Sequence, residues 1–209
     1  MAHEEEVPPA DEEKINRIRE ILRERGVKWE DEYTPPVPLR TSKEAGGVLD
    51  SLSLFLTGSL LHLPLLKKRL GKEDVSNPYT LLQSATDLFR RPIVLIGENH
   101  SWTFFPRGRA EGGGDKDELL GILLFAWDSS QPLKIIPVVP RWVGASREAW
   151  MESDELPPVY GEGRIPSSFP REIHFRGKVD VLCGEHTVPL LWELDRNLAG
   201  LPPLRTSNE

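Results

Sequence analysis

Apolar residues recur at helical spacing in four parts of the chain. Isoleucines and leucines three or four positions apart predict an amphipathic helix from Asp11, which can cap it, to about Arg25, with Gly26 as its C-terminal stop. The same spacing predicts helices over 47–58 and 60–71, each ended by glycine. A fourth helix is expected to start at Pro78 after a capping Asn77 or Ser76, and to end before Pro92.

The pattern then changes to short apolar runs separated by turn residues, which predicts strands. Strands are expected at 93–96, 102–105, 119–127 and 133–139, and the run over 119–127 is the most hydrophobic and should be central. Prolines and glycines predict an extended connector around 35–38 and a loop over 106–116. These elements together indicate an α/β (α+β) fold, with helices packed on a small mixed sheet.

The C-terminal part is less regular. Four prolines over 151–171 predict a long loop, and 172–175 with 178–182 predict a β-hairpin. Leucines over 190–198 predict a closing helix. We therefore expect four parts, which are a disordered acidic leader (1–10), an N-terminal helix and proline-rich connector (11–38), a core (39–145) and a C-terminal extension of loop, hairpin and helix (146–209).

Charge and hydropathy exclude several partners. Of the net charge of −7, residues 1–13 carry −6, so the remainder is nearly neutral and offers no basic face for duplex DNA. The longest apolar stretch, 54–66, is interrupted by polar residues and is shorter than the ~20 residues that span a bilayer. The acidic start does not resemble a secretory or mitochondrial presequence. We expect no DNA binding and no membrane association.

Candidate chemistry outside the main apolar pattern is sparse. The single cysteine cannot form an internal disulfide, which favours an intracellular reducing compartment, cytoplasmic or nuclear. Cys183 and His186 give two ligands where structural zinc needs four. The run Gly112 to Lys116 lacks the phosphate-loop spacing. We expect no metal and no cofactor.

The aromatic residues Trp102, Phe104 and Phe105 have two readings. They could stack on nucleic-acid bases or on a partner, but aromatic residues on a short strand are more often part of the core.

Four segments resemble the ovarian-tumour (OTU) family of deubiquitinases, in the family's order. LFRRPIVLI over 88–96 resembles its helix-to-strand junction, and GILLFAWDSS over 121–130 followed by KIIPVV over 134–139 resembles its last two core strands. EAGGVL over 44–49 resembles the motif that carries the nucleophilic cysteine and opens a helix. The resemblance covers residues 40–140 and implies an OTU-like cysteine-protease fold.

The same resemblance implies that the catalytic groups are missing. It places Gly47 at the nucleophile position and Lys134 at the general-base position, where the family has a histidine. Glycine has no side chain to attack a carbonyl carbon, and a lysine ammonium cannot take a proton from a thiol. The chain is therefore expected to be a pseudo-deubiquitinase.

Four functions stay open at this point. The first is a catalytically inactive domain that serves as a protein-interaction or assembly subunit, with a partner-binding site still unknown. The second is a non-catalytic module that binds ubiquitin or a ubiquitin-like protein. The third is a structural component of a large ribonucleoprotein, which the long proline-rich stretches would fit. The fourth is an active cysteine hydrolase that uses Cys183 with His186.

Overall fold

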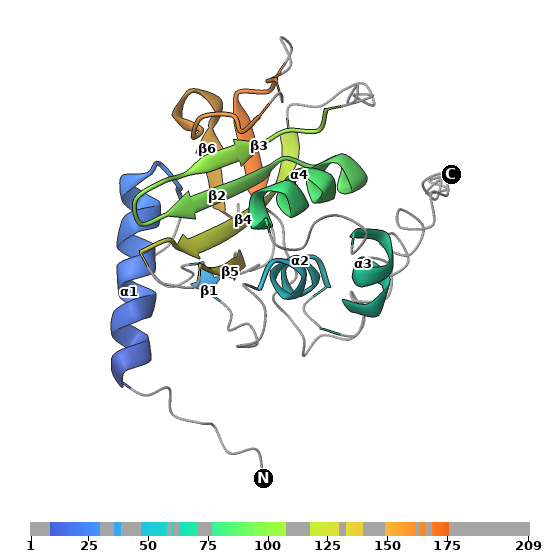
Figure 1. Ribbon diagram of the computed structural model, residues 1–209. Coiled ribbons are helices and arrows are strands. Elements are labelled where there is room, and N and C mark those ends of the chain that lie inside the picture. The colour runs from blue at the N-terminus through green and yellow to red at the C-terminus, as the bar shows by residue number, and fades with distance from the viewer. Residues whose placement is uncertain are drawn as a thin grey trace, which may run out of the picture.

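The computed structural model describes residues 9–29, 36–38, 47–57, 60, 63–70, 77–107, 118–129, 133–139, 149–161, 164–165 and 169–175. Within these residues the chain forms helices α1 to α4 and a mixed β-sheet (Figure 1). The predicted mixed α/β class is confirmed.

The first helix, α1 (Pro9–Glu24), begins two residues before the predicted cap, so Asp11 lies inside its first turn. Proline suits the start of a helix because the missing N–H has no intrahelical partner there. The predicted end is confirmed, since Gly26 has a φ of 95°, which glycine adopts without strain. Ile18 and Leu22 are buried, as the amphipathic pattern predicts.

Two further helices follow close to their predicted places. The helix α2 (Val48–Thr57) matches the prediction for 47–58, with Leu52 and Phe55 fully buried. The helix α3 (Leu63–Leu70) begins later than the predicted Leu60, which is exposed and accepts a hydrogen bond from the amide of Leu63 at 3.1 Å.

The fourth helix, α4 (Pro78–Phe89), has the predicted boundaries. The Asn77 side chain caps it by accepting a hydrogen bond from the amide of Tyr79 at 3.0 Å. Arg90 ends the helix in the left-handed conformation, with a φ of 53°. This turn directs the chain into the first core strand.

Five strands lie in the order β1 (Val37–Pro38), β5 (Lys134–Val139), β4 (Glu118–Trp127), β2 (Ile93–Gly97) and β3 (Trp102–Phe104). Within this order only β2 and β4 are parallel, and β4 is central as predicted. The predicted extended connector contributes β1, which pairs Val37 with Val139. A two-residue strand containing proline fits a sheet edge, because proline cannot donate to a second neighbour.

Two more strands join the other end of β4. The strand β7 (Glu172–Phe175) runs parallel to Glu118–Gly121, and β6 (Ala149–Glu152) pairs antiparallel with β7. The prediction of a continuous loop over 151–171 is therefore wrong at its start, where β6 ends and a short 3-10 helix, η1 (Ser153–Glu155), follows. Met151 pairs with Ile173, and both side chains are fully buried. The proline content of the segment does not report this long-range pairing, so it predicted a loop where a strand forms.

The remaining C-terminal predictions concern residues that the structure does not describe. The second hairpin strand (178–182) and the closing helix (190–198) lie outside the described residues. The first strand of the predicted hairpin is β7, which pairs with β4 along one edge and with β6 along the other.

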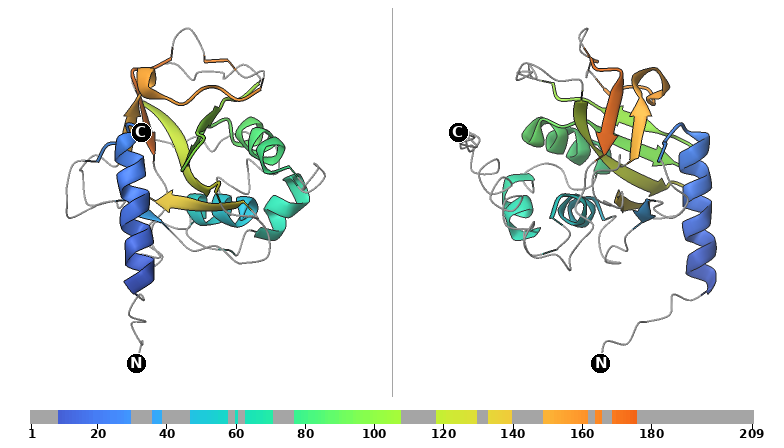
Figure 2. Two further views of the ribbon diagram at one scale, coloured as in Figure 1. Left: turned by 60° about the vertical axis from the view of Figure 1, so that its left-hand side comes forward. Right: turned by 180° about the vertical axis from the view of Figure 1, so that it is seen from behind.

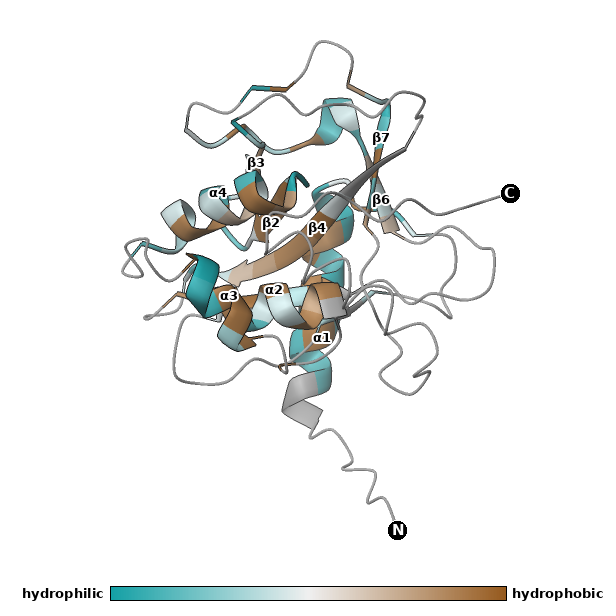
Figure 3. Ribbon diagram, turned by 90° about the vertical axis from the view of Figure 1, so that its right-hand side faces the viewer, coloured by the Kyte–Doolittle hydropathy of each residue, from teal (hydrophilic) through white to brown (hydrophobic). Residues whose placement is uncertain are grey.

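The sheet is covered on both faces. Figure 2 shows α1 on one side of the sheet and α2, α3 and α4 on the other. Every residue of β2 is buried, as is β4 from Gly121 to Ala126, which is typical of strands between two helical layers. The hydropathy colouring of Figure 3 shows the same continuous apolar band along β4. Polar groups gather where β2 and β4 end.

Candidate functional site

The two parallel strands of the core end side by side. The register pairs Gly97 at the end of β2 with Ala126 on β4, so Glu98 and Asp128 each follow their strand at the same edge of the sheet. Crevices at the carboxyl ends of adjacent parallel strands are a common place for ligands in α/β proteins. We therefore take this edge as the candidate site.

Asp128 fixes the loop that follows β2. Its carboxylate accepts hydrogen bonds from the backbone amides of Asn99 at 3.1 Å and His100 at 2.8 Å. The side-chain amide of Asn99 donates to the same carboxylate at 3.2 Å. The amides of Asn99 and His100 take part in no strand pairing, so Asp128 provides their hydrogen-bond acceptor. It thereby positions residues 99–101.

The loop turns tightly at Gly97. A Cβ atom at this position would lie 2.1 Å from the carbonyl oxygen of His100 and 2.9 Å from the carboxylate of Asp128. Only glycine permits this approach of backbone to backbone. A second link closes the edge, because Ser129 donates its hydroxyl to the Glu98 carboxylate at 2.5 Å.

The position of Lys134, at the start of β5, is beside this edge. Lys134 pairs with Trp127, the residue before Asp128, and its side chain is exposed. An exposed ammonium group at this place contributes a positive charge and no general base.

Gly47 lies directly before α2, where it is buried and has a φ of 73°. Its carbonyl oxygen accepts the first helical hydrogen bond, from the amide of Ser51 at 2.7 Å. Ser51 in turn donates its hydroxyl to the carbonyl oxygen of Ile135 at 3.0 Å. The two positions that the sequence singled out are thus connected, since Gly47 lies one turn from Ser51 and Lys134 is next to Ile135.

The remaining candidate residues are outside the described part of the chain or lie on β7. Cys183, His186 and the glycine-rich run at 112–116 lie outside the described residues. His174 is buried on β7, where its Nε2 lies 3.1 Å from a carboxylate oxygen of Glu172. Among the described residues, no group of three or more His, Cys, Asp or Glu side chains could hold a metal ion.

The core prediction for the aromatic residues is confirmed for Phe104 and Phe105, while Trp102 is half-buried and packs against the core. Phe104 and Phe105 are buried, and the Phe104 ring lies 5.1 Å from that of Tyr160. Tyr160 also stacks on Tyr79 at 5.5 Å. Burial raises the pKa of the Tyr79 phenol above its ordinary value of 10.0, and the nearby carboxylate of Asp128 acts in the same direction.

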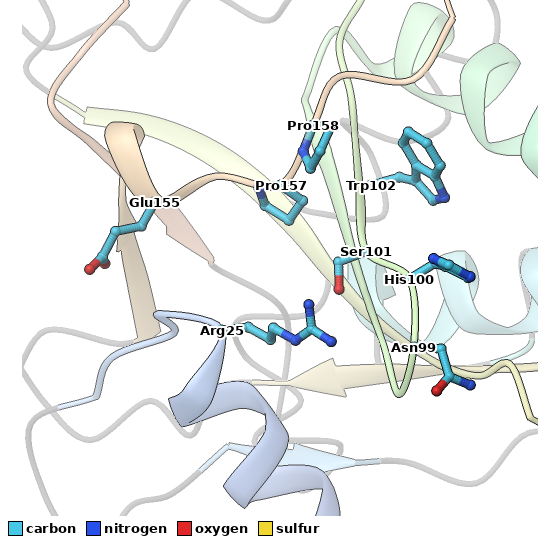
Figure 4. Close-up of a pocket in the computed structure, with 8 residues that line it drawn as sticks. All are labelled: Arg25, Asn99, His100, Ser101, Trp102, Glu155, Pro157 and Pro158. Atoms are coloured by element: carbon cyan, nitrogen blue, oxygen red, sulfur yellow. The ribbon is translucent and has the colours of Figure 1, made fainter.

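A pocket of about 310 Å³ lies beside the 99–102 segment, which lines it (Figure 4). Its lining residues come from three parts of the chain and are Arg25, Asn99, His100, Ser101, Trp102, Glu155, Pro157 and Pro158. Arg25 follows α1, and Glu155 ends η1. The pocket and the edge formed by Glu98 and Asp128 share the loop after β2.

Sequence reasoning identified the turns that contain Glu98 and Asp128 but did not bring them together. The missing information was the direction of β2 relative to β4, because only a parallel pair places both turns at one edge. Arg25 and Ser101 carried no signal in the sequence. Each belongs to an ordinary local element, and only the packing of α1 beside the 99–102 loop makes them neighbours.

Comparisons with known proteins give no match. No protein-family model, no curated protein and no solved structure matches this chain. The OTU-like assignment stays a prediction from sequence motifs. In the described part of the chain, no helix combines the length and the apolar character needed to cross a membrane.

Proposed function

We propose that this chain is a catalytically inactive OTU-like domain that serves as a protein-interaction or assembly subunit. The observation that carries the proposal is the hydrogen bond from Ser51 Oγ to the carbonyl oxygen of Ile135, 3.0 Å long. It connects the first turns of α2 with the start of β5. These are the helix and the strand to which the resemblance assigns the nucleophile and the general base.

The chemistry of the two positions supports loss of activity. A cysteine hydrolase needs a thiolate at a helix N-terminus, where the helix dipole lowers the thiol pKa, and a histidine within hydrogen-bonding reach. Gly47 supplies no side chain at the start of α2. Lys134 is an exposed cation at the start of β5, and an ammonium group has no lone pair with which to accept a proton.

The backbone at Gly47 supports the same conclusion. Its φ of 73° lies in the left-handed region, where a residue with a Cβ atom is strained by about 1 to 2 kcal/mol. Glycine fits this conformation, and cysteine would not. The local structure is therefore adapted to the residue that is present, with no requirement for a nucleophile.

The packing between helix and sheet is intact despite these residues. Leu52 and Phe55 of α2 are fully buried, and so are the hydroxyl-bearing side chains of Ser51 and Ser53. A scaffold that keeps its core without catalytic groups is suited to present surfaces to other molecules. This supports an interaction role over an enzymatic one.

The catalytic half of the proposal is tested with ubiquitin that carries a cysteine-reactive propargyl amide at its C-terminus. We expect no covalent adduct with the full-length wild-type chain, while an active OTU deubiquitinase in the same buffer is labelled completely. Cys183 is the single cysteine of the sequence. An adduct that forms with the wild type and disappears in Cys183→Ser would overturn the proposal and assign an active hydrolase.

The interaction half is tested by purifying the tagged full-length chain under native conditions, with and without ribonuclease. We expect a stoichiometric protein partner that remains bound after ribonuclease treatment. Elution of the chain alone in both conditions would contradict an assembly role. Loss of all partners only after ribonuclease would instead favour the ribonucleoprotein function.

A titration of labelled ubiquitin with the chain tests the alternative of a ubiquitin-binding module. The interaction role proposed here needs no ubiquitin contact. Amide shifts that saturate on one face of ubiquitin would replace the general interaction role with specific ubiquitin binding.

A further inference from the structure

The pocket next to the 99–102 loop has walls that are fixed by hydrogen bonds. Thr103 donates its amide to the carbonyl oxygen of Pro158 at 2.9 Å and its hydroxyl to that of Pro157 at 2.8 Å. Close in sequence to Arg25 and Glu155, the backbone amide of Lys28 donates to the carbonyl oxygen of Trp150 at 2.8 Å, and the amide of Trp150 donates to that of Lys28 at 3.0 Å. The pocket is therefore formed before a ligand arrives, which lowers the entropic cost of binding.

The end of α1 approaches this wall very closely. A Cβ atom on Gly26 would lie 2.9 Å from a carboxylate oxygen of Glu155. Glycine at this position lets the backbone pass beside η1, and it brings the side chain of Arg25 to the mouth of the pocket.

Arg25 differs from the neighbouring cations in its partners. Arg23 lies over the Trp29 ring at 4.6 Å, and Lys28 pairs with Glu152 at 3.1 Å. Within the described residues, the side chain of Arg25 makes one hydrogen bond, which it donates to the carbonyl oxygen of Glu98 at 3.4 Å. A guanidinium group has five N–H donors, so most of the donors of Arg25 remain for a ligand.

Ser101 supplies a second donor at the same place. Its hydroxyl oxygen accepts a hydrogen bond from the amide of Gly97 at 3.1 Å, so the hydroxyl proton is left to donate. Figure 4 shows Ser101 and Arg25 directed toward each other, while the rings of His100 and Trp102 turn to the opposite side of the strand. A guanidinium and a hydroxyl that converge are suited to bind an oxyanion.

Two carboxylates of this region, those of Glu155 on the pocket lining and of Glu98 before the loop, have partners of their own. Glu155 pairs with Lys28 at 3.6 Å, and Glu98 accepts the hydroxyl of Ser129 at 2.5 Å. Their charges therefore oppose an incoming anion less than two isolated carboxylates would.

The rest of the pocket selects an apolar group. Pro157 and Pro158 form its upper wall, and its volume of about 310 Å³ is at the small end of ligand sites, which span roughly 300 to 1,000 Å³. We propose that this pocket binds a carboxylate attached to a compact aliphatic group. The carboxylate would be held by Arg25 and Ser101, and the aliphatic group would pack on the prolines. The pocket offers these contacts whether or not α2 and β5 are related to a protease.

Such a carboxylate has two sources, the C-terminus of a peptide or a free aliphatic acid. The test is a titration of the ¹⁵N-labelled full-length chain with the dipeptide N-acetyl-glycyl-leucine, with its C-terminal amide, and with 4-methylpentanoate. We expect the dipeptide acid to shift the amides of residues 99–102 with a dissociation constant of about 1 mM, and the amide to bind at least about tenfold more weakly. Equal binding of 4-methylpentanoate would support the site and assign free acids to it.

The variants separate a binding role from a structural one. Arg25→Met should weaken binding of the dipeptide acid by about tenfold or more, and Ser101→Ala by about threefold to tenfold. The matched control is Arg17→Met on α1, where the native side chain pairs with Glu20 and does not line the pocket, and it should leave the dissociation constant unchanged. Arg25→Lys, which keeps the charge, should bind with intermediate strength and keeps the test valid if Arg25→Met fails to fold.

Three results would overturn the proposal. They are equal affinities for the acid and the amide, no shift at residues 99–102 up to about 20 mM ligand, and equal weakening by Arg17→Met and Arg25→Met. The ubiquitin-probe result is independent of all three, because that probe reports on the cysteine and this titration reports on Arg25.

Discussion

The carboxylate of Asp128 accepts a hydrogen bond from the backbone amide of His100 at 2.8 Å, across 28 residues of sequence. This contact and its companion to Asn99 tie the loop after β2 to the end of β4. The loop also forms one wall of the pocket that contains Arg25. Asp128 is therefore the residue that couples the edge of the core sheet to the proposed ligand pocket.

Replacing Asp128 by asparagine should loosen this loop. The amide group has one acceptor oxygen where the carboxylate has two, and its NH₂ group would face a backbone N–H, so we expect a loss of about 1 to 2 kcal/mol in the free energy of unfolding. The amides of Asn99 and His100 should exchange with deuterium faster than in the wild type. Exchange rates measured by NMR test this directly.

The control for Asp128→Asn is Asp154→Asn, because Asp154 is exposed on η1. It should change the unfolding free energy by less than about 0.5 kcal/mol. Unaltered exchange at Asn99 and His100 in Asp128→Asn would show that the loop does not depend on the carboxylate.

Gly97→Ala should be more disruptive than an ordinary glycine replacement. Its Cβ atom would lie 2.1 Å from the carbonyl oxygen of His100, so the backbone must move, and we expect a loss of about 2 to 3 kcal/mol. Gly161→Ala is the matched variant, since Gly161 has a φ of 65° but open space around it. That variant should lose about 1 kcal/mol from backbone strain alone. Urea unfolding of both variants gives the comparison, and equal losses would contradict the close approach at Gly97.

Ser51→Ala removes the hydrogen bond that links α2 to β5. Ser51 is fully buried and donates to Ile135 at 3.0 Å, so its loss should lower the unfolding free energy by about 1 kcal/mol. The control is Ser84→Ala at a half-buried position of α4, where the same gain in helix propensity applies. If both variants are equally stable in urea unfolding, the link between α2 and β5 contributes nothing to stability.

The phenol of Tyr79 should titrate above its ordinary value of 10.0. Burial raises its pKa, and the carboxylate of Asp128 acts in the same direction, so the folded state favours the neutral phenol. The folded state then holds its proton at a pH where the unfolded chain has lost it. The contribution of Tyr79 to stability is therefore complete below pH 10.0 and is lost as the pH rises through the raised pKa.

The measurement is the absorbance of tyrosinate near 295 nm, recorded for the wild type and for Tyr79→Phe. Of the three tyrosines in the sequence, the difference between the two titrations reports Tyr79 together with its effect on Tyr160, which stacks on it. We expect the difference curve to have its midpoint above pH 10.0. A midpoint at or below this value would show that Tyr79 is not shielded from solvent by its neighbours.

Local signals in the sequence were sufficient for several elements of this fold. Asn77 before Pro78 predicted the start of α4, and the structure shows the capping hydrogen bond at 3.0 Å. Gly26 predicted the end of α1. The hydrophobic run over 119–127 predicted the central strand, because a strand buried on both faces has few polar positions.

The candidate site was less accessible to sequence reasoning. Gly47 and Lys134 were singled out, and the Ser51–Ile135 hydrogen bond connects their neighbourhoods. Glu98 and Asp128 lie in the turns predicted between the strands, and the sequence indicated nothing more about them. Arg25 and Ser101 were not identified, because a single arginine after a helix and a serine in a turn have no distinctive spacing.

The sequence by itself determined where most helices and strands of the described region begin and end, since caps, turns and hydrophobic periodicity act over a few residues. Only the tertiary structure decided that β7 pairs with β4, that Asp128 holds the loop after β2, and that Arg25 faces Ser101. Each of these contacts joins segments far apart in the chain. Their formation depends on how distant segments pack against one another, which no local pattern reports.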